Sequence, residues 1–125
     1  MSEPTHQDLM EQVIEELSIF NIKCTEAQAD LLIKDLELVI EKNKVVNLTR
    51  IVALRDAVTL HLVDSLVPLG TKHFKPSEEL RFLDIGTGAG FPGIPIIISF
   101  YLQRVIAITS AGLNSLILNV CVPSP

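Results

Sequence analysis

The residues best suited to chemistry lie in one short stretch, where a carboxylate is followed by three closely spaced glycines. Asp84 ends an apolar run, and Gly86, Gly88 and Gly90 alternate with small residues before Phe91. Glycine adopts backbone angles that side chains forbid, and it lets a ligand contact the main chain. The pattern predicts a strand that leads into a nucleotide-binding turn. Asp84 is then either a fixed acceptor beside the ligand or an ordinary polar strand end.

Two other nucleotide loops fit this stretch poorly. A Walker loop needs a lysine after its second glycine, whereas Gly93 is followed by Ile94 and Pro95. Residues 88–93 match the dinucleotide pattern G-x-G-x-x-G in letters, but the prolines remove amide hydrogens that would face a pyrophosphate. No acidic residue follows Asp84 to hold a ribose. We expect a ligand with little phosphate, and an NAD-binding oxidoreductase is the weaker alternative.

A histidine and an aspartate upstream form a second candidate pair. His61 and Asp64 are three positions apart, a spacing that puts them on one face of a helix within hydrogen-bond reach. They either tie the helical region to the glycine turn or border a pocket beside it. Asn47 is suited to bracing a turn through its side chain. His6 and His73 fall in unrelated segments without a Cys/His cluster, so we expect no metal site.

Three motifs, in this order along the chain, resemble one enzyme family. They are Asn47-Leu48-Thr49, His61-Leu62-Val63-Asp64-Ser65, and Leu83-Asp84-Ile85-Gly86-Thr87-Gly88-Ala89-Gly90-Phe91-Pro92-Gly93-Ile94-Pro95. The last resembles motif I of the class I S-adenosylmethionine methyltransferases. Together they resemble the RsmG family, also called GidB, which methylates N7 of a guanine in the 16S ribosomal RNA of the small subunit.

This resemblance implies a cofactor, a partner and a set of site residues. The cofactor is S-adenosyl-L-methionine, and the partner is small-subunit ribosomal RNA or its particle. The implied cofactor-binding residues are Asp84, Gly86, Gly88, Gly90 and Phe91. Gly86 lines the pocket with its backbone and Phe91 by packing, although Phe91 also fits a core aromatic.

The second set of implied residues borders the cofactor and substrate pocket. Its members are Asn47, His61, Asp64 and Ser65. No catalytic residue is assigned, because N7 of guanine has a free lone pair and no proton to remove. Positioning the base in line with the methyl group does most of the work.

The chain departs from the family pattern after the glycine turn. Thr109 stands where class I methyltransferases carry an acidic ribose ligand, and Leu113 and Asn114 replace a basic pair. Between Ile85 and Pro125 the only charged residue is Arg104, too few charges for exposed helices. We expect this part to be incomplete or altered, so a catalytically inactive truncated fragment is the second hypothesis.

Composition sets the broad class. The chain has 125 residues, 48% of them hydrophobic, a net charge of −5 and a pI near 5.1. We expect one modest domain with no secretory signal and no membrane span. Two distant cysteines fit unpaired thiols in the cytoplasm. Lys44, Arg50 and Arg55 are candidates to touch RNA phosphate, although this pI is wrong for a free-standing RNA binder.

The predicted fold class is α/β. Residues 1–75 form a helical N-terminal region, and residues 76–125 begin a Rossmann-like S-adenosylmethionine-binding domain with its first β-α-β unit. We expect helices from residues 5–8 to 18, over 25–42 with a Thr25 and Gln28 capping box, and over 56–67. A loop over 72–79 precedes a strand at 80–85. A helix over 93–100, a strand at 105–109 and a tail helix over 113–122 follow.

Overall fold

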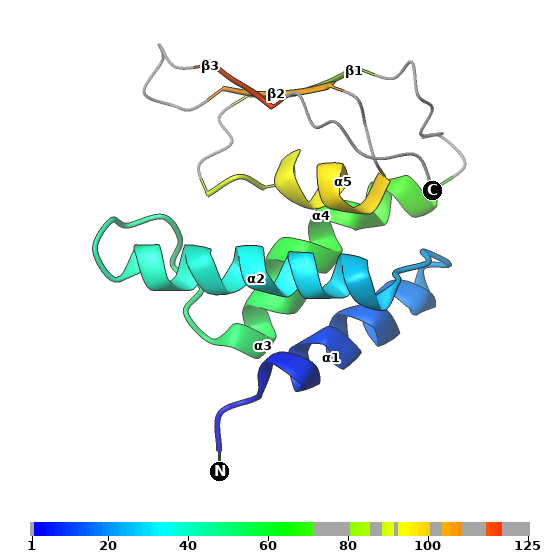
Figure 1. Ribbon diagram of the computed structural model, residues 1–125, viewed down its shortest axis with the longest axis vertical. Coiled ribbons are helices and arrows are strands. Elements are labelled where there is room, and N and C mark those ends of the chain that lie inside the picture. The colour runs from blue at the N-terminus through cyan, green and yellow to red at the C-terminus, as the bar shows by residue number, and fades with distance from the viewer. Residues whose placement is uncertain are drawn as a thin grey trace.

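The computed structural model describes residues 2–71, 81–85, 89–91, 93–100, 104–108 and 115–118. Figure 1 shows the helices stacked below a small sheet, with one helix between the sheet and the others. Gly86, Gly88, Thr109 and the expected loop over 72–79 lie outside the described residues. The expected division near residue 75 falls there too and stays a prediction.

The first two helices are set by their caps and their apolar stripes. Helix α1, His6–Ile19, begins with Thr5 and Asp8 in a reciprocal capping box, and α2, Glu26–Asn43, begins with the same arrangement of Thr25 and Gln28. Each box satisfies two amides that the helix itself leaves unpaired. Both helices confirm the sequence prediction to within a residue or two at either end.

The third helical segment is continuous but not uniform. It consists of α3 (Leu54–Ala57), the π-helix η1 (Val58–Val63), α4 (Asp64–Leu66) and the 3-10 helix η2 (Val67–Gly70). We predicted a single helix over 56–67 that stops before Gly70. The segment in fact starts two residues earlier and continues through Gly70, so the predicted stop before Gly70 is wrong. Pro68 near the start of η2 is compatible with a tight final turn because it has no amide hydrogen to donate.

The sheet contains strands β1 (Arg81–Ile85), β2 (Arg104–Ile108) and β3 (Ser115–Leu118), hydrogen-bonded in that order. Strands β1 and β2 are parallel, and α5, Gly93–Phe100, lies between them along the chain. That these elements begin a Rossmann-like β-α-β domain stays a prediction. The predicted tail helix over 113–122 is wrong in its centre, where β3 pairs antiparallel with β2. Residues 116–118 are apolar without helical period, and the backbone of β3 pairs with backbone groups along β2 that need partners.

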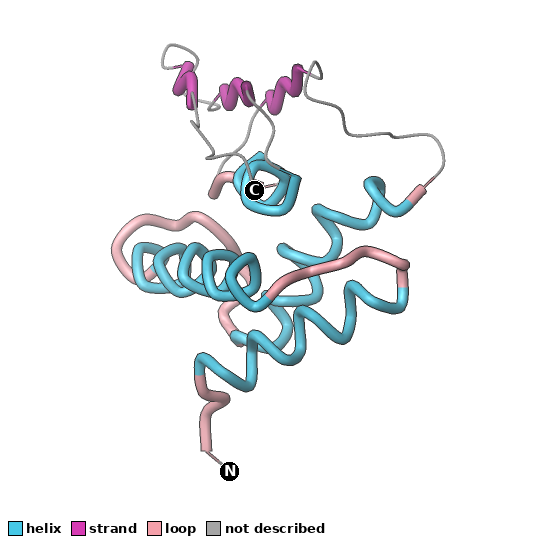
Figure 2. Tube along the Cα trace, turned by 45° about the vertical axis from the view of Figure 1, so that its right-hand side comes forward, coloured by secondary structure: helices cyan, strands magenta, loops and turns pink. Residues whose placement is uncertain are grey.

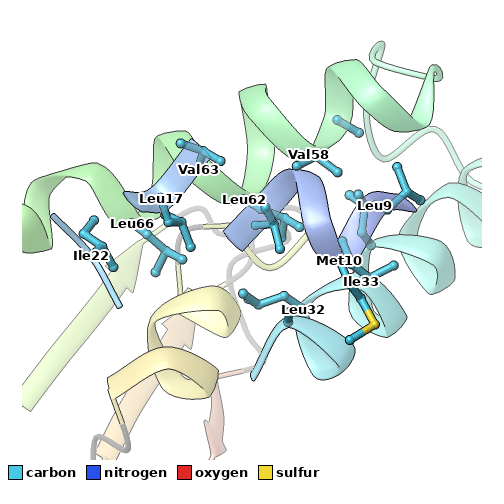
Figure 3. Packing of buried hydrophobic residues seen from close by; sticks show 14 of the residues in the cluster. Leu9, Met10, Leu17, Ile22, Leu32, Ile33, Val58, Leu62, Val63 and Leu66 are labelled. Atoms are coloured by element: carbon cyan, nitrogen blue, oxygen red, sulfur yellow. The ribbon is translucent and has the colours of Figure 1, made fainter. Parts of the chain in front are cut away.

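One hydrophobic core joins all the helices. Figure 3 shows Leu9, Leu17, Leu32, Leu62 and their neighbours interdigitating between α1, α2 and η1. Ile96 of α5 belongs to the same buried cluster, so α5 is seated on the helical layer while the sheet covers its other side (Figure 2). Among the described residues, no helix combines the length and apolar character needed to cross a membrane.

Candidate functional site

Three segments that are far apart in the sequence meet at the imidazole ring of His61. The His61 Nε2 atom lies 2.8 Å from the hydroxyl of Thr49, which belongs to the Asn47-Leu48-Thr49 motif. The imidazole also stacks on the phenyl ring of Phe91, which lies parallel to it at a centroid distance of 4.6 Å. The structure thus places one residue from each of the three sequence motifs in a single cluster.

The loop that carries Thr49 is held by an asparagine that the sequence analysis did not single out. The side-chain oxygen of Asn43 accepts hydrogen bonds from the amides of Leu48 at 2.7 Å and Thr49 at 2.9 Å. The Thr49 hydroxyl also accepts a hydrogen bond from the Ile51 amide. An asparagine at the last residue of a helix is a capping signal that could have identified Asn43.

The prediction that Asn47 braces the turn is wrong, whereas its place beside the pocket stays a prediction. Its side chain is exposed, and it has no hydrogen-bond partner within the part of the chain that the structure describes. The bracing amide in this loop belongs to Asn43, four residues earlier. Asn47 therefore presents a free amide to solvent beside the Thr49 and His61 contact.

The π-helix η1 decides where His61 points. A hydrogen bond from the Asp64 amide to the Thr59 carbonyl closes a wide turn around His61. The sequence prediction assumed α-helical spacing, and the expected hydrogen bond between His61 and Asp64 is absent among the described contacts. Asp64 is exposed, whereas His61 turns inward to Thr49 and Phe91. Short π-helical turns of this kind are frequent at functional sites.

Ser65 supports the same turn from within. Its side chain is buried, and its hydroxyl donates a hydrogen bond to the His61 carbonyl. The Ser65 hydroxyl is thus engaged with backbone. Ser65 therefore stabilises the helix at His61 through this bond, and its predicted place at the pocket stays a prediction.

The glycine turn approaches this cluster from the other side. Gly90 has a φ of +96°, in the region that favours glycine. A Cβ atom on Gly90 would lie 2.5 Å from Cδ1 of Ile94, and the Gly90 carbonyl accepts a 2.8 Å hydrogen bond from the Ile94 amide. The predicted need for glycine is confirmed at this position. Asp84 lies in β1 opposite Ala107, and its side chain is not among the described groups.

Helix α5, which follows the turn, is anchored to α2 by a buried glutamine. The Gln28 side-chain amide donates a 3.0 Å hydrogen bond to the Ser99 carbonyl near the end of α5. The oxygen of the same side chain caps α2 through the Thr25 amide. Sequence reasoning identified only the capping role of Gln28. The second bond holds α5, and with it the glycine turn, against the helical layer.

The imidazole of His61 is neutral near pH 7. Burial lowers the pKa of His61 below its ordinary value of 6.5, against a smaller opposing effect of the Asp64 carboxylate. A neutral imidazole stacked on a phenyl ring presents no net charge. The cluster is therefore suited to packing and orientation more than to proton transfer.

Comparison with known proteins decides the family. The sequence model of GidB, described as rRNA small subunit methyltransferase G, matches residues 28–113, which include all three motifs. The chain belongs to the GidB family. No solved structure gives a significant match.

The curated relatives carry the same description. The chain is 42% identical over 76 residues to ribosomal RNA small subunit methyltransferase G of Alkaliphilus oremlandii, covering 61% of this chain and 31% of that protein. It is 38% identical over 103 residues to the Pelotomaculum thermopropionicum protein of that name, covering 82% and 42%. The Streptococcus equi subsp. zooepidemicus protein is 45% identical over 64 residues, covering 51% and 27%. The chain thus spans less than half the length of these GidB relatives.

Proposed function

We propose that this chain is the part of a methyltransferase that begins its cofactor-binding domain, and that the enzyme modifies N7 of a guanine in small-subunit ribosomal RNA. The observation that carries the proposal is the meeting of Thr49, His61 and Phe91, one from each motif. Membership of the GidB family supports the reaction class, and the names of the relatives support ribosomal RNA as the substrate. The strand, turn and helix from Arg81 to Phe100 would then begin a Rossmann-like domain.

The described residues fit S-adenosylmethionine as the methyl donor. Gly90 is a buried, side-chain-free turn residue with positive φ, and the half-buried Phe91 next to it offers an apolar surface for a nucleoside. Asp84 in β1, with Gly86 and Gly88 after it, would complete the binding set. When bound, the sulfonium group of this cofactor supplies an electrophilic methyl group.

The residues of the chain itself would then position the cofactor-binding turn. Thr49 fixes the ring plane of His61, and His61 fixes Phe91 through the stack. Guanine N7 needs no base to remove a proton, so a neutral His61 is consistent with this reaction. Orientation of two reactants accounts for a large part of the rate enhancement in such a transfer.

A methyl-transfer assay tests the proposal. The protein that contains this sequence is incubated with radiolabelled S-adenosylmethionine and small ribosomal subunits that lack N7-methylguanine, and the label is mapped by chemical cleavage at the modified base. Label at a guanine N7 supports the function. Label on another atom, or NAD binding without S-adenosylmethionine binding, contradicts it.

A second candidate is a fragment that folds without catalysing transfer. The short share of the relatives' length and the threonine at position 109 favour it. The same assay on the 125-residue chain alone separates the two, because robust turnover excludes the inactive fragment. Cofactor binding without turnover would instead support it.

A further inference from the structure

Charge is divided sharply along the helical layer. Residues 2–41 carry ten acidic and two basic side chains, whereas residues 42–55 carry four basic side chains and no acidic one. The low overall pI therefore comes mostly from residues 2–41, and residues 42–55, from the last turn of α2 onward, are locally cationic. Separated charges of this kind attract a polyanion to one face even when the net charge is negative.

The cationic part is an ordered loop at the end of the molecule that holds the candidate site. Residues 42–52, here called the basic segment, run from the last residues of α2 through the loop that leads to α3, and Figure 1 shows this loop at the same end of the molecule as the start of α5. Asn43 pins the backbone of this segment from one side, and the contact of Thr49 with His61 pins it from the other. Its outer side chains remain open to solvent, with Val45 86% and Val52 67% exposed.

The four cations are not equivalent. Arg55 donates to the side chain of Gln12 on α1 at 3.2 Å and faces the acidic region. Lys44 pairs with Glu41 at 3.1 Å, but both side chains are mostly exposed, so the pair is weak. Lys42 and Arg50 are exposed and make no ion pair within the described ranges. These two, with Lys44, are the charges open to a ligand.

We propose that the basic segment is the surface on which substrate RNA lies as a guanine reaches the Phe91 and Gly90 turn. This inference rests on the proposed function. Lys42, Lys44 and Arg50 would contact phosphates, which carry most of the affinity in such complexes. The free amide of Asn47 lies between these cations in the sequence, where it can hydrogen-bond a sugar or base edge. Because Thr49 belongs to the same segment, RNA bound there is held next to the His61 cluster.

RNA binding measured at several salt concentrations tests this surface. The full chain and the double variant Lys42→Gln/Arg50→Gln are titrated with deproteinised small-subunit ribosomal RNA. The variant should bind more weakly, and the slope of log affinity against log salt should fall by about 1 to 2, since each lost phosphate contact removes somewhat less than one released counterion. The matched control Lys23→Gln/Lys34→Gln removes two cations from the acidic region and should leave the slope unchanged.

The outcomes separate this inference from the proposed function. An unchanged slope in Lys42→Gln/Arg50→Gln, an equal loss in the control, or no RNA binding by the parent chain overturns the basic segment as the RNA surface. S-adenosylmethionine affinity is measured on the same samples and should be the same in all three proteins. Absence of S-adenosylmethionine binding by the parent chain would count against the proposed function instead.

Discussion

The imidazole of His61 and the phenyl ring of Phe91 lie within 2° of parallel, with their centroids 4.6 Å apart. This stack joins the helical layer to the glycine turn at the point where the cofactor is proposed to bind. Aromatic pairs of this geometry contribute about 0.5–1.5 kcal/mol beyond the burial of their surface. The contact therefore helps to hold the turn against the helical layer, together with the Gln28 bond to α5.

Replacing Phe91 by leucine removes the stack but keeps an apolar side chain. We expect the free energy of unfolding to fall by about 0.5–1.5 kcal/mol, measured by urea denaturation. S-adenosylmethionine affinity should fall as well, because the turn loses its orientation. The matched control is Phe20→Leu, at a partly exposed phenylalanine at the end of α1. Equal cofactor affinity in Phe91→Leu and the parent would show that the stack does not order the site.

Substitution of Asn43, at the end of α2, should lower the free energy of unfolding much more than substitution of Asn47 in the loop that follows. Asn43→Ala leaves the amides of Leu48 and Thr49 without their acceptor, and we expect a loss of about 1–3 kcal/mol in the free energy of unfolding. Asn43→Asp keeps an acceptor oxygen and should retain most of the stability. Asn47→Ala changes an exposed side chain and should stay within about 0.5 kcal/mol of the parent. A larger loss for Asn47→Ala than for Asn43→Ala would mean that the bracing residue is misassigned.

His6 links α1 to α2 in a pH-dependent way. Its ring nitrogens lie 2.6 Å from a Glu37 oxygen and 2.8 Å from an Asp30 oxygen, and hydrogen bonds to these two carboxylates raise the pKa of His6 above 6.5. A raised pKa in the folded state stabilises the protein fully below pH 6.5, and this stabilisation is lost as pH rises through the folded value. The parent should therefore lose stability from slightly acid to slightly alkaline pH.

His6→Gln provides the comparison for that loss. Glutamine cannot place two positively charged donors on both carboxylates, so the variant should be less stable than the parent at pH 6 and nearly equal to it once His6 is neutral. Thermal denaturation across this range measures the difference. Parallel curves for the two proteins over the whole range would rule out the proposed linkage.

Asp35 is a carboxylate whose burial opposes its ionisation. One of its oxygens is buried without a hydrogen-bond partner among the described residues, and burial raises the pKa of Asp35 to about 6 from an ordinary value of 3.8. Because the folded value is the higher one, stability falls as pH rises from 3.8 to about 6 and stays lower above that range.

Asp35→Asn removes this penalty while keeping the side-chain size. We expect a gain of about 1–3 kcal/mol near pH 7, from roughly 1.4 kcal/mol per unit of pKa shift, and little change near pH 4. The exposed carboxylate of Asp56 on α3 supplies the control, since Asp56→Asn should be nearly neutral at both pH values. A gain of the same size at pH 4 would attribute the effect to packing and not to charge.

Short-range sequence patterns predict much of the fold. The threonines at positions 5 and 25, each with a hydrogen-bonding partner three residues later, predict where α1 and α2 begin, and an apolar run before glycines predicts β1. The strand β3 was missed because an apolar segment without period has no local preference, and pairing with β2 decides its structure. The π-helix was missed for a related reason, since its wide turn depends on tertiary contacts.

The sequence predicted which motifs belong to the candidate site, but not which of their side chains contact one another. Motif order indicated that Asn47, His61 and Phe91 belong to one family pattern, yet only the folded chain reveals that Thr49 and not Asn47 touches His61. The expected pairing of His61 with Asp64 failed because it assumed α-helical spacing in a π-helical turn. Side-chain contacts between elements distant in sequence cannot be read from spacing alone.

Isothermal titration of the chain with S-adenosylmethionine and with NAD tests the central claim most directly. The parent should bind S-adenosylmethionine weakly and NAD not at all, and Thr109→Asp should tighten S-adenosylmethionine about ten- to a hundredfold by restoring a charged acceptor for the ribose. Combining Thr109→Asp with Phe91→Leu should reverse part of that gain. Binding of NAD in preference to S-adenosylmethionine by the Thr109→Asp chain would contradict the account.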